Sequence, residues 1–105
     1  YPNAAVLHSG FQDVPIPAGS FSLAIGNPPF GRDVLNFRTP QEANGRTIHN
    51  QFLIASLHDV APGGVMAMVV SHHLMDALDA GSRMKLAEMG NLIGAVRLPS
   101  NAFME

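Results

Sequence analysis

The chain of 105 residues contains no cysteine, which excludes a disulfide framework and a thiolate metal site. Charge is scarce as well, because charged residues make up 13% of the chain, about half of the roughly 25% typical of globular domains. A fraction this low suits a segment that is mostly buried inside something larger. The net charge of −2 gives no basic excess of the kind that a self-sufficient DNA-binding domain carries. Most of any grip on nucleic-acid phosphates would therefore lie outside these residues.

Long apolar runs are missing too. No window approaches 18 unbroken apolar residues, so we expect no transmembrane helix, and the N-terminus lacks the basic and apolar pattern of a signal peptide. The absence of cysteine fits a reducing compartment. We therefore expect a cytoplasmic protein of one domain without a membrane partner.

Short apolar runs alternate with helical patterns along most of the chain. Residues 1–20 hold three of the eight prolines and show no helical period, so they are expected to be an irregular lead-in. Residues 21–105 are expected to be the folded part. Runs rich in strand formers predict strands, and apolar residues at helical spacing predict helices. Strands are predicted at 21–25, 65–70 and 92–98. One helix is predicted to begin at Ile48, after Thr47 as N-cap, and a helical region at 74–89 is predicted to be interrupted near Gly81 and Ser82. A mobile polar loop is predicted at 31–47 and a turn at Pro62-Gly63-Gly64.

Alternating strands and helices with short connections are typical of a parallel sheet. The predicted fold class is α/β, a partial Rossmann-like parallel sheet in a three-layer arrangement. Three strands and two helices make an incomplete sheet, because a buried central strand needs neighbours on both edges and helices on both faces. We therefore expect residues 21–105 to be the C-terminal part of a larger catalytic domain. The unpaired sheet edges would let the isolated chain self-associate.

The sequence Asn27-Pro28-Pro29-Phe30 comes directly after the first predicted strand. In open parallel sheets, ligands bind at the carboxyl ends of the strands. Two consecutive prolines fix φ twice and remove two N–H donors, which makes a rigid turn. In that turn the Asn27 side-chain oxygen and the Pro28 carbonyl can both accept from one NH₂ group. Such a pair can draw the amine hydrogens out of conjugation with a ring and free the nitrogen lone pair to attack an electrophilic methyl group.

Phe30 adds a flat face for a nucleobase. Stacking on an aromatic ring contributes about 1–3 kcal/mol per base. An enzyme that modifies a base in duplex DNA must also extrude that base from the helix, which costs free energy. Acceptors for the amine and a stacking ring in the same motif could together bind a base that has been extruded from the helix.

The stretch Phe21–Gly31 resembles the catalytic motif of the S-adenosylmethionine-dependent N6-adenine DNA methyltransferases. The resemblance implies that Asn27 and Pro28 bind the target amine. It also implies that Pro29 holds the loop and that Phe30 stacks on the adenine. The implied reaction is direct methyl transfer from S-adenosylmethionine to the N6 amine of adenine in DNA, without a metal.

Downstream residues extend the resemblance over roughly residues 11–103. The stretch Ala61–Val65 leads into a strand as in the family, and Arg97–Phe103 looks most like large bacterial, phage or plasmid proteins that join such a methylase to a helicase-like region. Family members often carry Asp where Ser22 stands. Their glycine-rich cofactor loop lies upstream, and residues 1–20 contain nothing similar, so the cofactor-binding residues stay unassigned, with Asn27 as the one candidate contact. The resemblance therefore implies an upstream cofactor-binding half as a partner, and an isolated chain that is inactive.

Alternatives stay open at this point. The acceptor pair suits any planar NH₂ group, so the chain could belong to a methyltransferase for RNA guanine amines or for protein glutamine side chains. It could also be a non-catalytic, methyltransferase-like scaffold, and the motif could be an ordinary proline turn.

Candidate DNA contacts are Arg32, Arg38 and Arg46, which make up half of the six basic residues and all lie in the loop beside the motif. They could bind phosphates near an extruded base. The alternative, which the sequence favours equally, is that these arginines are solvated loop residues whose charge is partly neutralised by neighbouring acidic residues.

The histidines do not form a predicted metal site. His72 and His73 follow a predicted strand, but no further ligand stands at metal-binding spacing, which favours a loop or the start of a helix. His8, His49 and His58 are scattered and are expected at the surface.

Overall fold

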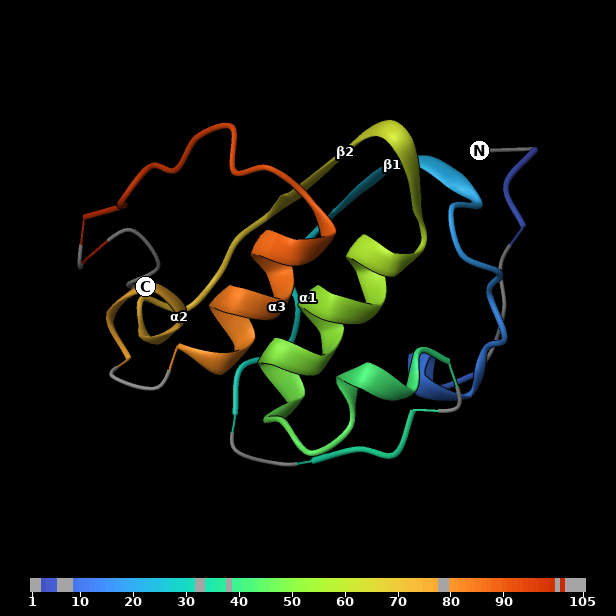
Figure 1. Cartoon of the computed structure of the whole chain (residues 1–105), viewed down its shortest axis with the longest axis horizontal. Coiled ribbons are helices and arrows are strands. Elements are labelled where there is room, and N and C mark those ends of the chain that lie inside the picture. The colour runs from blue at the N-terminus through green and yellow to red at the C-terminus, as the bar shows by residue number, and fades with distance from the viewer. Residues whose placement is uncertain are drawn as a thin grey trace.

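The computed structural model describes residues 3–5, 9–31, 34–37, 39–77, 80–99 and 101. They form a mixed α/β unit in which two strands lie behind a layer of helices (Figure 1). The elements in chain order are the 3-10 turn η1 (Phe11–Asp13), β1 (Phe21–Gly26), the 3-10 turn η2 (Gln41–Ala43), α1 (Ile48–His58), β2 (Val60–Met68), α2 (His73–Asp76) and α3 (Gly81–Met89).

The two strands form a parallel sheet, as the apolar runs predicted. In the register of this sheet, Leu23 lies opposite Val65 and Gly26 lies opposite Met68. The backbone N–H of Val69 also donates to the Gly26 carbonyl at 3.0 Å, so the two chains stay together to the end of β1. Both carboxyl ends therefore meet at the same edge of the sheet.

β2 begins earlier than expected, at Val60, and the turn predicted at Pro62-Gly63-Gly64 lies inside it as an irregularity of the register with β1. Gly63 has a φ of +83°, which a residue with a side chain rarely adopts. Gly64 lies so close to β1 that a Cβ atom on it would be 2.8 Å from the Ser22 carbonyl oxygen. The two glycines therefore let this part of β2 fold tightly against its neighbour.

We expect Gly64→Ala to lower the free energy of unfolding by about 1–3 kcal/mol, the usual cost of an extra methyl group in a packed site. The methyl group would meet the Val60 Cγ1 atom at 2.7 Å and the Ser22 carbonyl oxygen at 2.8 Å, and the second of these is backbone that cannot rotate away. Gly94→Ala is the control, because a Cβ atom there meets nothing within 4 Å. Urea unfolding followed by circular dichroism measures both variants, and equal stabilities would contradict this prediction.

α1 is the central helix of the described chain. It begins at Ile48, as predicted, and contacts β2, η2 and α3. Figure 1 shows α1 and α3 side by side over the same face of the sheet. Contacts on several sides bury much of the helix, and its buried residues are His49, Gln51, Leu53, Ile54 and Ala55. Next to it, the rings of Phe11, Phe37 and Phe52 pack with their centroids 4.9 to 5.9 Å apart.

The other face of the sheet is uncovered in the described part of the chain. Phe21, Leu23 and Ile25 alternate along β1 and are 52%, 56% and 73% exposed, whereas Ala24 between them is half-buried. The expected three-layer arrangement has helices on both faces of a sheet. The described residues supply two layers, the sheet and the helices on one face.

The second helical region is interrupted, as predicted, but before Gly81 rather than at Gly81 and Ser82, which lie in a helix. α2 ends at Asp76, the next residue Ala77 is extended, and α3 begins at Gly81. Arg83 of α3 donates through one guanidinium nitrogen to the carbonyls of Leu74 and Ala77, at 3.0 and 2.8 Å. These bonds satisfy carbonyls at the C-terminal end of α2 that the helix itself leaves unpaired.

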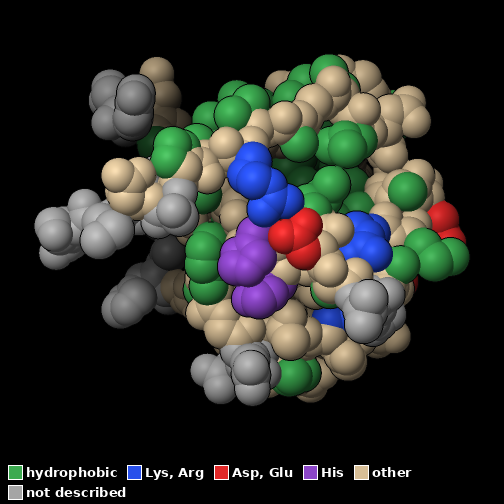
Figure 2. All heavy atoms as spheres, turned by 90° about the vertical axis from the view of Figure 1, so that its left-hand side faces the viewer, with side chains coloured by type: hydrophobic (Ala, Val, Ile, Leu, Met, Phe, Trp, Pro, Cys, Tyr) green, Lys and Arg blue, Asp and Glu red, His purple; other side chains and the backbone are tan. Residues whose placement is uncertain are grey.

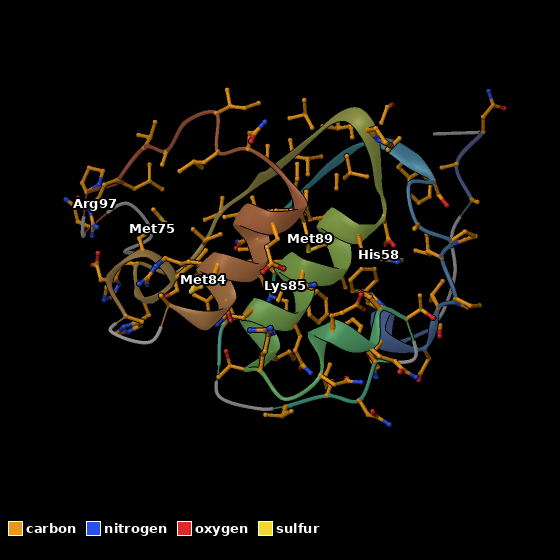
Figure 3. All side chains as sticks on the ribbon, in the orientation of Figure 1. His58, Met75, Met84, Lys85, Met89 and Arg97 are labelled. Carbon is orange, nitrogen blue, oxygen red and sulfur yellow. The ribbon has the colours of Figure 1, made fainter. Side chains whose placement is uncertain are left out.

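The third strand predicted at 92–98 is not formed. Among the described residues, no backbone group pairs with this segment, and Ile93 and Val96 are 86% and 85% exposed. An extended segment becomes a strand only when a neighbour supplies hydrogen bonds, and here the chain runs outside the sheet (Figure 1). An ion pair of 2.9 Å between Arg97 and Asp76 instead holds the segment next to α2 (Figure 3).

Candidate functional site

The motif Asn27-Pro28-Pro29-Phe30 follows β1 directly, at the edge of the sheet where β2 also ends. Pro28 is buried, whereas Asn27, Pro29 and Phe30 are exposed. The buried proline anchors the turn in the fold and its neighbours face the solvent. The turn is therefore held firmly and yet is open to a ligand.

Two oxygen atoms of the motif have no partner among the described residues. The Asn27 side chain makes no hydrogen bond there, and no described group donates to the Pro28 carbonyl. A depression of about 260 Å³ adjoins the motif. It is lined by Phe11, Gly26, Asn27, Pro28, Pro29, Phe52, Ser56 and Met68. This mostly apolar lining suits a flat ring or a methyl group.

Phe30 keeps 55% of its surface exposed. Its described aromatic partner is the imidazole of His49, whose ring centroid lies 4.9 Å away with the two planes at 82°. Edge-to-face contact of this kind is a favoured aromatic geometry and holds a ring at a defined angle. Much of Phe30 therefore remains free for a second flat ring to stack on.

The prediction that His49 is a surface residue is wrong. His49 is 5% exposed, in the first turn of α1 and four residues before the buried Leu53. Its Nε2 atom accepts the backbone N–H of Ser71 at 3.1 Å, and its Nδ1 atom lies 3.2 Å from Asn50 Oδ1. Because a backbone N–H can only donate, Nε2 is unprotonated and Nδ1 carries the hydrogen. The spacing to Leu53 on one helix face is the sequence signal that could have placed His49 inside.

The stability of the chain should fall at mildly acidic pH because of His49. Burial lowers the pKa of His49, and the hydrogen bond to Asn50 only partly offsets this effect. The unfolded chain takes up a proton near the ordinary histidine pKa of about 6.5, whereas the folded chain takes it up at lower pH. In that interval the unfolded state binds more protons, so the stability present above about pH 6.5 is lost as the pH falls toward the folded pKa.

Urea unfolding at a series of pH values between about 7.5 and 5 tests this expectation. His49→Gln removes the titrating group and should flatten the dependence in this interval, whereas Gln41→Ala, at an exposed residue without a titratable group, should leave it as in the unmodified chain. Burial raises the pKa of Asp59, but this carboxyl is common to all three proteins and its contribution cancels in the comparison. A His49→Gln variant with the same pH dependence as the unmodified chain would refute the role of His49.

The loop expected at 31–47 is less open than its polar composition indicated. Phe37 is 2% exposed, and two side-chain amides hold its own backbone and that of Leu35. Gln51 accepts the N–H of Leu35 at 2.8 Å and donates to its carbonyl at 2.6 Å. Asn44 accepts the N–H of Phe37 at 2.7 Å and donates to its carbonyl at 3.0 Å. The amides thus pair with alternate residues, much as a neighbouring strand would.

Of the three candidate DNA contacts, Arg32 and Arg38 lie outside the described residues. Arg46 donates to the Glu42 carbonyl and to the Ser82 hydroxyl, both at 3.2 Å, and so joins η2 to α3. Contact of these arginines with phosphate stays a prediction.

The remaining histidines take different positions. His72 and His73 are exposed, with ring centroids 4.0 Å apart, and Figure 2 shows histidine side chains at the surface. They lie at the start of α2, which confirms the helix-start interpretation. His58 is half-buried, with Nδ1 3.0 Å from an Asp59 oxygen, and His8 lies outside the described residues. No group of three histidine or acidic side chains in the described ranges is arranged to hold a metal ion.

Comparison with known proteins finds no match for this chain among protein-family models, curated proteins or solved structures. Within the described residues, no helix has the length and apolar character needed to cross a membrane. The residues and geometry of the sheet edge are therefore the basis on which a function is assigned.

Proposed function

We propose that this chain is the amine-binding part of an S-adenosylmethionine-dependent methyltransferase that acts on the N6 amine of adenine in DNA. One observation carries the proposal. The Asn27 side chain is exposed and has no hydrogen-bond partner among the described residues, at the carboxyl edge of a parallel sheet, and it is followed directly by the buried anchor Pro28 and then by the exposed aromatic ring of Phe30. An acceptor, a rigid turn and a stacking surface at such an edge are what recognition of a flat amine-bearing ring requires.

The chemistry of the chain's own residues follows from this arrangement. The Asn27 Oδ1 atom and the Pro28 carbonyl accept the two hydrogens of the adenine amine. They turn the amine out of the plane of the ring, so that its lone pair is no longer delocalised and can act as a nucleophile. Phe30 holds the extruded base by stacking. The motif contains no titratable side chain, so the proton of the methylated amine passes to the solvent to which Asn27 is open.

The described residues do not by themselves form a site for the cofactor. The depression beside Asn27 has an apolar lining with one hydroxyl, that of Ser56, and no acidic side chain that could bind ribose hydroxyls. In the proposed protein the cofactor supplies the electrophilic methyl group, and the residues that bind it belong to an upstream half. The two-layer arrangement is compatible with such a half, because the uncovered sheet face is where the third layer of a Rossmann-like domain would lie.

A methyl-transfer assay on the full-length protein that carries this sequence tests the proposal. Isotope-labelled S-adenosylmethionine is supplied with duplex DNA, with RNA or with a protein extract, and the modified nucleosides and amino acids are identified by mass spectrometry. We expect the label in N6-methyladenine of DNA. Label confined to guanine of RNA or to glutamine would assign a different substrate to the same site, and the absence of label from all three would support a non-catalytic scaffold.

A further inference from the structure

We propose that His49 is a positioning residue of this site, which holds the Phe30 ring at the angle needed to receive the substrate base. The inference rests on the proposed function, because it concerns the surface on which the adenine stacks. It adds a residue that lies outside the four-residue motif and comes from a different element, the first turn of α1.

His49 is placed to hold Phe30 because it joins the two loops that leave the sheet at its carboxyl edge. Its ring contacts Phe30, in the loop after β1, with a centroid distance of 4.9 Å. Its Nε2 atom accepts the backbone N–H of Ser71, in the loop after β2, at 3.1 Å. Since α1 lies in the sequence between these strands, one side chain ties three consecutive parts of the fold together at the site.

The partners of His49 hold its ring in one orientation. Asn50 receives the Nδ1 hydrogen at 3.2 Å, which fixes the tautomer that leaves Nε2 free to accept from Ser71. Ser71 is itself fixed, because its hydroxyl accepts the N–H of His73 at 3.2 Å and its carbonyl accepts the N–H of Leu74 at 3.1 Å. Burial favours the neutral ring and so lowers the pKa of His49, in agreement with these hydrogen bonds. The support behind Phe30 is therefore built from the buried His49 ring and from half-buried groups of Asn50 and Ser71.

The decisive experiment is a double-mutant cycle on methyl transfer by the full-length protein, with His49→Gln and Phe30→Ala made singly and together. Glutamine keeps an oxygen that can accept from Ser71 but removes the ring that contacts Phe30. We expect His49→Gln to lower kcat/KM about tenfold, since misplacement of a reacting group by about 1 Å costs up to roughly 100-fold. In the Phe30→Ala background the same substitution should change kcat/KM less than about twofold, because no ring is left to position.

A measurement without substrate separates this inference from the proposed function. The χ1 rotamer population of Phe30 is measured by NMR from three-bond couplings in the unmodified protein and in His49→Gln, with circular dichroism to confirm that both are folded. We expect one dominant rotamer in the unmodified protein and averaging over several rotamers in His49→Gln. An unchanged rotamer population, or a loss of activity that is as large in the Phe30→Ala background, would overturn the role of His49 even if DNA is methylated. Rotamer averaging in a protein that methylates none of the three substrates would support the His49–Phe30 coupling and reject the proposed function.

Discussion

Replacement of Asn27 by alanine is expected to lower the rate of adenine methylation by about 100-fold or more, the usual effect of removing one preorganised hydrogen-bonding group from an active site. In the proposed mechanism the substitution removes one of the two acceptors that turn the adenine amine out of the ring plane, and the Pro28 carbonyl alone would not hold both hydrogens. The amine then stays conjugated and its lone pair is a poor nucleophile. Steady-state methylation by the full-length protein, with DNA as substrate, measures the loss.

A loss of activity in Asn27→Ala can be separated from a loss of stability. The Asn27 side chain is exposed and makes no hydrogen bond within the described residues, so its removal should change the free energy of unfolding by less than about 0.5 kcal/mol. Asn91→Ala is the matched control, because Asn91 is an exposed asparagine outside the motif.

Asn27→Asp distinguishes an acceptor from a merely space-filling side chain. It keeps an oxygen at the same position and should retain more activity than Asn27→Ala. Equal rates for Asn27→Ala and Asn91→Ala would contradict the assigned role of Asn27 and with it the chemistry proposed for the motif.

The parts of the fold that could be predicted are those in which local pattern and tertiary environment agree. Phe21–Gly26 is an apolar run rich in strand formers followed by a rigid proline turn, and it forms a strand by pairing with β2, although five of its six residues are exposed in the described part of the chain. The helix at Ile48–His58 has apolar residues at helical spacing and is stopped before the Pro-Gly-Gly bulge. Because the strand and the turn are adjacent in sequence, the position of the motif at the sheet edge follows from the sequence as well.

The remaining features depend on residues that are distant in sequence. The stretch 92–98 has a composition typical of strands, yet a strand requires a hydrogen-bonding neighbour, and composition does not show which neighbours are present. His49 and Gln51 are polar residues that read as solvent-facing positions of a helix. They are buried because α1 is covered on several sides, and each is paired by a backbone group of another segment.

Phe37 shows the same effect in the loop after the motif. Its polar neighbours indicated an open loop, whereas its ring packs against Phe11 and Phe52, at centroid distances of 5.9 Å to each. The aromatic contact draws the loop onto α1, and the amides of Gln51 and Asn44 then satisfy the backbone that this brings inside. The order of the loop is therefore a consequence of burial together with hydrogen bonding.

Because burial of the loop depends on these hydrogen bonds, the largest expected loss of stability is that caused by replacing Gln51. Gln51→Ala should lower the free energy of unfolding by about 2–4 kcal/mol, because it leaves both the N–H and the carbonyl of Leu35 without a partner and opens a small cavity. Gln51 is 0% exposed, and its hydrogen bonds to Leu35 are short, at 2.8 and 2.6 Å. A loss of this size is a large share of the roughly 5–15 kcal/mol that stabilises a typical domain.

Urea unfolding measures the stability of the whole chain, whereas hydrogen exchange shows which backbone amides lose protection in Gln51→Ala. In Gln51→Ala the Leu35 amide should exchange much faster relative to the amides of β1, because only the loop loses its partner. Gln41→Ala is the matched control, since Gln41 is exposed on η2 and its truncation should cost less than about 0.5 kcal/mol.

The loop continues directly from Phe30, so a Gln51→Ala protein that still folds should also hold its stacking ring less firmly and bind an adenine base more weakly. Equal stability and equal Leu35 exchange in the two glutamine variants would show that the loop is held by the packing of Phe37 alone.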